Sequence, residues 1–270
     1  MLRVRDVWKT FNAGTPNEVR SLQGVNLDLD SGSFIVIIGT NGSGKSTLLN
    51  AVAGAWFVDA GKIELDGRDV TRWPEYKRAA LLGRVFQNPF SGTAPNLSIA
   101  ENVALAARRG MRRGLGWSRE RKLMDQIRGA VSQLNMGLEN RLDNAIGSLS
   151  GGQRQALTLM MATWVQPKLL LLDEHTAALD PKSADKVIRL SEEIISRDKL
   201  TSLMVTHSMH QAVHLGDRLI MMHRGKVIHD YRGAEKRRLR PEDLLARFED
   251  LRRADQLDES AAEMLRRTYV

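Results

Sequence analysis

The sequence predicts an α/β fold with a mainly parallel core sheet. Three short, continuously apolar segments are typical of strands buried on both faces, and they lie at residues 33–39, 168–174 and 201–207. Stretches with helical character separate them, so the strands are expected to be joined by crossovers and to run parallel. The 270 residues, 42% of them hydrophobic, suffice for one large domain with an inserted subdomain.

The first thirty residues predict an N-terminal antiparallel β subdomain. Apolar and polar residues alternate in two short runs, and the turn-rich segment 12–18 separates the runs. The apolar strand 33–39 comes next, followed by a glycine-rich turn and a helix from Ser46 to about Ala53. A second core strand is predicted at 81–87.

Residues from about 88 to 150 predict a helical subdomain inserted into the sheet. The pattern there becomes polar and helical, with helices expected at 102–109 and 121–134. Another helix is expected to begin at Gln153. Strand character then returns in the apolar segments already described and at 217–223, which restores the α/β pattern.

Charge is distributed unevenly along the chain. The formal net charge is +8, and residues 108–122 alone hold seven basic side chains and one acidic one. Such a cluster suits nucleic acid, anionic lipid headgroups or a partner protein, and equally a solvated surface. Residues 232–270 instead mix ten basic with nine acidic side chains, which predicts a C-terminal helical extension after a main domain of residues 1–231.

Composition excludes several kinds of protein. Cysteine is absent, which rules out disulfide frameworks and thiolate metal sites. No apolar run approaches the 18 or so residues that a membrane-spanning helix needs. The N-terminal segment lacks the apolar region of a signal peptide, so we expect a cytoplasmic location.

The segment after the first core strand matches the phosphate-loop pattern G-x-x-x-x-G-K-[ST]. It reads GTNGSGKST over residues 39–47, between a predicted strand and a predicted helix. Backbone N–H groups of such a loop, together with the helix dipole, bind phosphate. Lys45 is expected to reach the β- and γ-phosphates, and the Ser46 hydroxyl to ligate Mg²⁺. The residues expected to contact the nucleotide here are Gly39, Asn41, Gly42, Ser43, Gly44, Lys45, Ser46 and Thr47.

Two carboxylates follow the apolar strand that begins at Leu169. Asp173 lies at the carboxyl end of this strand, where ligands bind in open α/β sheets, and is expected to hold Mg²⁺. Glu174 comes next and is the best candidate to orient or deprotonate an attacking water.

A second phosphate-binding element is predicted more than a hundred residues after the first. Ser150, Gly151 and Gly152 come directly before the helix expected at Gln153, so small residues expose backbone N–H groups at a helix N-terminus. The first loop is already a complete phosphate-binding element, so the role of a second one in the same chain needs an explanation.

Together these residues resemble the nucleotide-binding subunit of ABC transporters, a P-loop NTPase family that binds and hydrolyses ATP. The resemblance covers residues 1 to about 230 in the expected order. Its most specific motif is the signature LSGGQ at 149–153, which other P-loop classes lack. By resemblance, four further residues have family roles: Gln87 as the Q-loop glutamine and a Mg²⁺ ligand, Asp180 in the D-loop, His207 as the switch histidine and Phe11 as the aromatic that stacks on adenine. Trp8 competes with Phe11 for the last role.

The resemblance explains the second phosphate-binding element. In this family two subunits pack head to tail, and each ATP lies between the phosphate loop of one chain and the signature loop of the other. The resemblance therefore implies a homodimer in which Ser150, Gly151, Gly152 and Gln153 contact ATP held by the partner. It also implies separate membrane permease subunits, a location on the inner face of the cell membrane, an extracytoplasmic solute-binding protein and no nucleic acid partner.

A finer resemblance points to a bacterial importer subfamily described as putative tryptophan or tyrosine uptake. It depends on PEYKRA at 74–79, LSGGQRQALTLMMAT at 149–163 and DEHTAALDPK at 173–182. The last of these departs from the wider family, which commonly has proline where this chain has His175. The alternatives are an exporter ATPase, a DNA-acting ATPase of the same superfamily and a P-loop kinase. A P-loop kinase would not need the signature motif.

Overall fold

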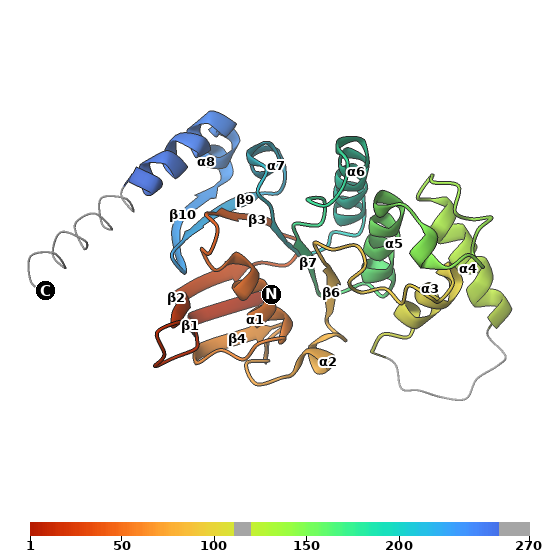
Figure 1. Ribbon diagram of the computed structural model, residues 1–270, viewed down its shortest axis with the longest axis horizontal. Helices are drawn as coiled ribbons and strands as arrows, with labels where there is room; N and C mark the ends of the chain where they lie inside the picture. Colours follow the sequence, from red (N-terminus) through yellow and green to blue (C-terminus); the bar gives the residue numbers. More distant parts are fainter. Residues whose placement is uncertain (111–119, 254–270) are drawn as a thin grey trace, which may run out of the picture.

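A small antiparallel sheet forms the N-terminal part of the structure. The computed structural model describes residues 1–110 and 120–253 (Figure 1). Four strands lie in the order β2-β1-β4-β5, with β1 antiparallel to both β2 and β4. Their bounds are β1 Leu2–Phe11, β2 Val19–Leu29, β4 Ala60–Leu65 and β5 Arg68–Asp69. The first two match the expected alternation, whereas β4 and β5 carried no distinct signal in the sequence.

A six-stranded sheet in the order β10-β9-β3-β8-β7-β6 forms the core. All neighbouring pairs are parallel except β10 and β9 at one edge. Every residue of β3 and β8 is buried, which explains the continuous apolar runs. The α/β fold class is therefore confirmed. The bounds are β3 Phe34–Gly39, β6 Leu82–Val85, β7 Leu169–Asp173, β8 Ser202–Val205, β9 Arg218–His223 and β10 Lys226–Arg232.

Helices gather in three places around the sheets (Figure 1). α1 packs between the two sheets, α3, α4 and α5 form a group at one end, and α7 and α8 lie near the opposite end. The bounds are α1 Lys45–Ala53, α2 Glu75–Arg78, α3 Ile99–Ala107, α4 Glu120–Ser132, α5 Gly151–Trp164, α6 Pro181–Arg197, α7 Met209–His214 and α8 Gly233–Arg238. Residues 241–253 form a further helix. Within the described ranges, no helix has the length and apolar character to cross a bilayer.

Two helices begin earlier than expected because serine side chains cap them. α3 begins at Ile99 rather than residue 102, since Ser98 accepts a hydrogen bond from the backbone of Glu101. α5 begins at Gly151 rather than Gln153, since Ser150 caps it in the same way. Both glycines of the signature therefore lie inside the first helical turn.

Much of the arginine-rich stretch 108–122 falls outside the described residues. Arg109 is described, and it is not a free surface cation. Its guanidinium donates hydrogen bonds to the carbonyls of Ala162 and Val165 at the end of α5. Reversing its charge would therefore disturb the packing of α3 on α5.

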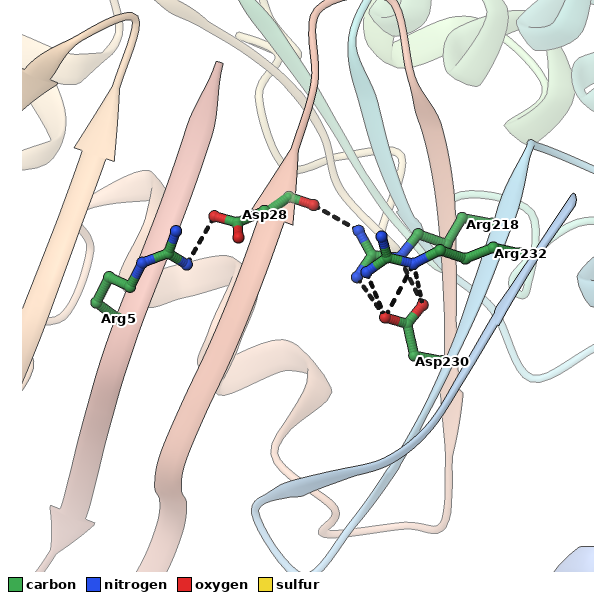
Figure 2. A network of polar contacts seen from close by, with 5 residues as sticks. All are labelled: Arg5, Asp28, Arg218, Asp230 and Arg232. Carbon is green, nitrogen blue, oxygen red and sulfur yellow. Dashed lines mark hydrogen bonds and ion pairs between the residues drawn. The ribbon is translucent and has the colours of Figure 1, made fainter.

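A polar network joins the two sheets on one side of the molecule (Figure 2). Arg218 on β9 and Arg232 on β10 both contact the carboxylate of Asp230. Arg218 also donates to the backbone carbonyl of Asp28 on β2, whose carboxylate pairs with Arg5 on β1 at 2.7 Å. Burial would raise the pKa of Asp230, but the hydrogen bonds from the two arginines lower it to about 2.

Candidate functional site

The phosphate loop joins β3 to α1 and leaves the start of that helix without a cap. α1 begins after Gly44, which makes no side-chain hydrogen bond to the helix, and its first turn holds no acidic residue. By contrast, α3, α5, α6 and α7 are capped by Ser98, Ser150, Asp180 and Ser208. The first N–H groups of an α-helix lack intrahelical acceptors, so α1 offers its donors and its dipole to an anion.

Gly44 is required by the path of the loop. Its φ is 96°, which favours glycine, and an added Cβ would lie 2.3 Å from the carbonyl oxygen of Ser21. Gly39 is equally restricted, since a Cβ there would lie 2.3 Å from the carbonyl oxygen of Met222. The loop can take this shape only with these two glycines.

The Lys45 ammonium lies over the loop. Its Nζ donates to the carbonyls of Gly39 and Thr40, each at 3.0 Å, and the side chain is buried. Burial lowers the pKa of Lys45, while Glu174 and Asp173 act to raise it. The cation is thus directed at the space that the loop encloses, where phosphate oxygens can replace the two carbonyls.

The other polar side chains of the loop differ in exposure. Ser46 and Asn41 are exposed, and so is Gly42. The Thr47 hydroxyl lies 2.6 Å from the Ser21 hydroxyl, in a buried hydrogen bond. The Ser43 hydroxyl is buried and makes no hydrogen bond within the described residues. A buried hydroxyl without a partner fits a loop that completes its hydrogen bonds with phosphate.

Asp173 and Glu174 lie together at the carboxyl end of β7. Arg84 on the neighbouring strand β6 places its Nη2 3.6 Å from an Asp173 carboxylate oxygen. Burial raises the pKa of Asp173, and Arg84 and Lys45 oppose this only in part. Glu174 has a φ of 46°, a left-handed conformation that is uncommon outside glycine and turns its side chain away from the strand direction.

His207 faces Glu174 across the ends of two adjacent strands. It follows β8, which pairs with β7, and its Nε2 lies 2.6 Å from a Glu174 carboxylate oxygen. The Glu174 side chain is 10% exposed and the His207 side chain 47%. The pair therefore places a carboxylate beside a solvent-accessible imidazole at the edge of the sheet that also carries the phosphate loop.

The signature residues lie on the other side of β6 and β7 from α1 (Figure 1). Ser150 and Gln153 form a reciprocal capping box at the start of α5. Gly151 is exposed, whereas Gly152 packs so tightly against Ser183 that a Cβ would lie 2.7 Å from the serine Cβ. A hollow of about 180 Å³ opens beside them, lined by Met136, Ser150, Gly152, Gln153, Ser183 and Lys186. The two phosphate-binding elements of one chain thus belong to separate parts of the structure.

This chain resembles known proteins both in sequence and in structure. A family model described as ABC transporter matches residues 22–177. A tyrosine transport ATP-binding protein of Clostridioides difficile (strain R20291) is 41% identical over 251 residues, which cover 92% of this chain and 99% of the relative. The lipoprotein-releasing system ATP-binding protein LolD of Ruegeria sp. (strain TM1040) is 32% identical and covers 84% of this chain and 97% of its own. The dimeric ATP-binding cassette MJ0796, bound to ADP and Pi, matches with a TM-score of 0.73 and 28% identity, covering 86% of this chain and 98% of that one.

The chain is a member of the ABC transporter ATP-binding family. It is accordingly an ATPase subunit of a transporter, as the sequence predicts. Three predicted site residues remain to be placed in this ABC subunit. Gln87 is exposed and follows β6 by two residues. Phe11 is the last residue of β1, and its ring meets that of Trp56 edge-on at 4.9 Å. Asp180 caps α6 by accepting from the backbone of Ser183.

Trp8, the alternative to Phe11, has another role in this ABC subunit. Its indole N–H donates to the Asp6 carboxylate at 2.8 Å, and its ring packs near Gly24. The indole is therefore held on its own strand, whereas Phe11 ends the strand and contacts Trp56, which follows α1 by three residues.

Sequence reasoning missed three polar residues that hold the site in place. Arg84 contacts Asp173 and also donates to the Asn50 side chain at 2.7 Å; a charge within an otherwise apolar strand was its only signal. The buried Gln155 donates to the backbone carbonyl of Phe86, next to Gln87, at 2.9 Å. Gln211 accepts from the Thr206 hydroxyl at 2.6 Å, next to His207. Nothing in the sequence marks the two glutamines.

Proposed function

We propose that this ABC ATPase powers an importer for a small solute such as an aromatic amino acid. The observation that carries the proposal is the 41% identity, over nearly the full length of both chains, to a tyrosine transport ATP-binding protein. The solute itself would contact other chains, namely membrane permease subunits and an extracytoplasmic solute-binding protein. The ATPase would lie in the cytoplasm, on the inner face of the cell membrane.

The proposed working unit is a head-to-tail pair of these chains. Within one chain the signature residues lie apart from the phosphate loop (Figure 1), and the start of α5 is left exposed at Gly151. A pair would bring the signature of one copy against ATP held by the other. The MJ0796 cassette, which this chain resembles over 98% of that structure's length, is dimeric.

Each predicted residue has a proposed role in hydrolysis. The loop residues 39–47 and Lys45 bind the phosphates, Phe11 stacks on adenine, and Asp180 borders the shared site. Ser150, Gly151, Gly152 and Gln153 donate to the γ-phosphate held by the partner, at the positive end of α5. Glu174 orients the attacking water, and His207 and Gln87 contact the γ-phosphate region as the pair closes.

The site also fits Mg²⁺, which we propose as cofactor. Its oxygen donors are the exposed Ser46 hydroxyl, the Asp173 carboxylate and the Gln87 amide, the hard ligands that Mg²⁺ prefers. In the part of the chain that the structure describes, no group of three or more His, Cys, Asp or Glu residues could hold a metal. Such a sparse set suits an ion that is held jointly by protein and nucleotide phosphates, whose charge it neutralises during phosphoryl transfer.

Export is a second candidate, and the similarity to a lipoprotein-releasing system favours it. That relative is 32% identical, against 41% for the tyrosine transport protein, over a smaller share of this chain. Import is therefore the better supported direction.

Uptake by cells that lack this chain tests the proposal. Deleting its gene is expected to abolish high-affinity uptake of radiolabelled tyrosine or tryptophan and to leave lysine uptake unchanged. The unmodified chain restores uptake, and Glu174→Gln does not. Unchanged aromatic amino-acid uptake in the deletion strain, together with loss of efflux of some other solute, would overturn the import proposal in favour of export.

A further inference from the structure

A buried lysine of the C-terminal extension caps the C-terminal end of α7, the short helix that follows His207. Lys236, on α8, is 5% exposed, and its ammonium donates to three backbone carbonyls: those of Val213, Leu215 and Gly216, at 3.0, 2.7 and 2.7 Å. An ammonium has three protons, and all three are used. These carbonyls belong to the C-terminal end of α7 and the turn after it, where a cation also complements the helix dipole.

α7 is tied to the catalytic strands at its other end. Ser208, the residue after His207, caps the helix by accepting from the Gln211 backbone. The Gln211 side chain accepts from the Thr206 hydroxyl at 2.6 Å, and the same hydroxyl accepts from the Ser208 backbone at 3.1 Å. His207 therefore lies between two residues, Thr206 and Ser208, that both hydrogen-bond to Gln211 on α7.

The extension also covers α7 with apolar side chains. Ala212 and Leu215 are buried in the same cluster as Tyr231, Leu244 and Phe248, which all come from the last strand and the helices after it. Lys236 thus supplies the polar part of a surface that packs against α7 and the turn after it.

We propose that Lys236 is a positioning residue for His207. By holding the end of α7, it fixes the helix that begins two residues after His207, and so the position from which His207 reaches Glu174, at 2.6 Å. Without the ammonium, three carbonyls lose their donor, and α7 can shift or unwind while the phosphate loop stays intact. The C-terminal extension is then a functional part of the ATPase site. This inference rests on the proposed role of His207.

Single-turnover hydrolysis tests the proposal, because it reports only on chains that have bound ATP. We expect Lys236→Met to lower the first-order rate by about tenfold, with the dissociation constant for ATP changed less than about twofold. Amide hydrogen exchange in residues 207–216 should rise, and exchange in β3 should not. Arg237→Met is the matched control, since Arg237 lies next to Lys236 on α8 and is exposed.

Three results would overturn the proposal. The first is an unchanged single-turnover rate in Lys236→Met. The second is an equal loss in Arg237→Met. The third is a loss in Lys236→Met that is just as large when His207 is already alanine, because a positioning role requires His207 to be present. If Lys236→Met does not fold, Lys236→Gln retains an N–H donor and takes its place. His207→Ala alone separates the failure of the Lys236 proposal from the failure of the proposed role of His207. Normal turnover in that variant would contradict the role of His207 itself.

Discussion

His175 is a packing residue, although it stands beside a predicted catalytic residue in the sequence. It follows Glu174 directly, yet it is 1% exposed and lies against α6. The Ser191 hydroxyl donates to the Val187 carbonyl, so the His175 Nε2–H must donate to Ser191, at 2.9 Å. Burial lowers the pKa of His175 to about 4, which keeps the ring neutral.

The stability of the protein should therefore depend on pH through His175. The unfolded chain takes up a proton on this residue below about pH 6.5, whereas the folded chain does so only near pH 4. The stability that the neutral ring provides is present above about pH 6.5 and is lost as the pH falls toward 4. Between pH 7.5 and 5, we expect the unmodified chain to lose about 2 kcal/mol of unfolding free energy more than His175→Gln. Urea unfolding at both pH values measures this difference; parallel losses in the two proteins would contradict the assignment.

The motif residues could be predicted because phosphate and metal binding require particular residue types at a fixed spacing in the sequence. Lys45, Asp173 and Glu174 could be named from a loop pattern and a strand end. Arg84 and Lys236 could not, because their partners are a carboxylate on another strand and backbone carbonyls far along the chain. A carbonyl carries no mark in the sequence that says which side chain will bind it.

At the scale of elements, buried cations end three helices of the described chain. Arg78 donates to the carbonyls of Ala51 and Val52 at the end of α1, Arg109 does so for α5, and Lys236 for α7. Burial lowers the pKa of Arg78 to about 10, which still leaves it charged at neutral pH. The helices that surround the site are thus fixed at their far ends by charges that the sequence shows only as part of a basic composition.

Gly151→Asp tests the role of α5 as an element that acts on another chain. An aspartate in the first turn favours the helix itself, by about 0.3–1 kcal/mol. Its Cβ would lie 3.2 Å from the flexible end of the Leu179 side chain, which can move aside, so the fold should be retained. The same charge would repel a γ-phosphate brought to the start of α5. We expect ATP binding by the variant's own phosphate loop to persist and steady-state turnover to fall by at least about a hundredfold.

Gly129→Asp is the control for this prediction. Gly129 lies in α4, is exposed and has open space for a side chain. It receives the same change in charge within the same group of helices. Equal turnover in the two variants would contradict a special role for the N-terminus of α5.

The elements themselves could be predicted better than their ends. The buried strands β3, β7 and β8 follow from continuous apolar runs, whereas β4 and β5 are short, partly exposed and marked by no pattern that separates them from a loop. Capping side chains moved the starts of α3 and α5 by two or three residues. Caps depend on local geometry that periodicity alone does not report.

At the scale of the whole molecule, separate regions depend on one another. Arg218 and Asp28 join the core sheet to the antiparallel sheet (Figure 2), and Lys236 joins the C-terminal extension to α7. The phosphate loop and the signature, by contrast, are not joined within one chain (Figure 1). On the proposed pairing, each chain contributes its phosphate loop to one site and its signature residues to the other.

A shared site is the central claim, and the mass of the Glu174→Gln variant in solution tests it most directly. This variant should bind ATP and hydrolyse it very slowly, so a closed pair would accumulate. Light scattering is expected to show the mass of one chain without nucleotide and of two chains with ATP and Mg²⁺. Adding Gly151→Asp to the same chain should return the mass to that of one chain. A monomer at every ATP concentration, or a pair that forms equally well with Gly151→Asp, would contradict the account.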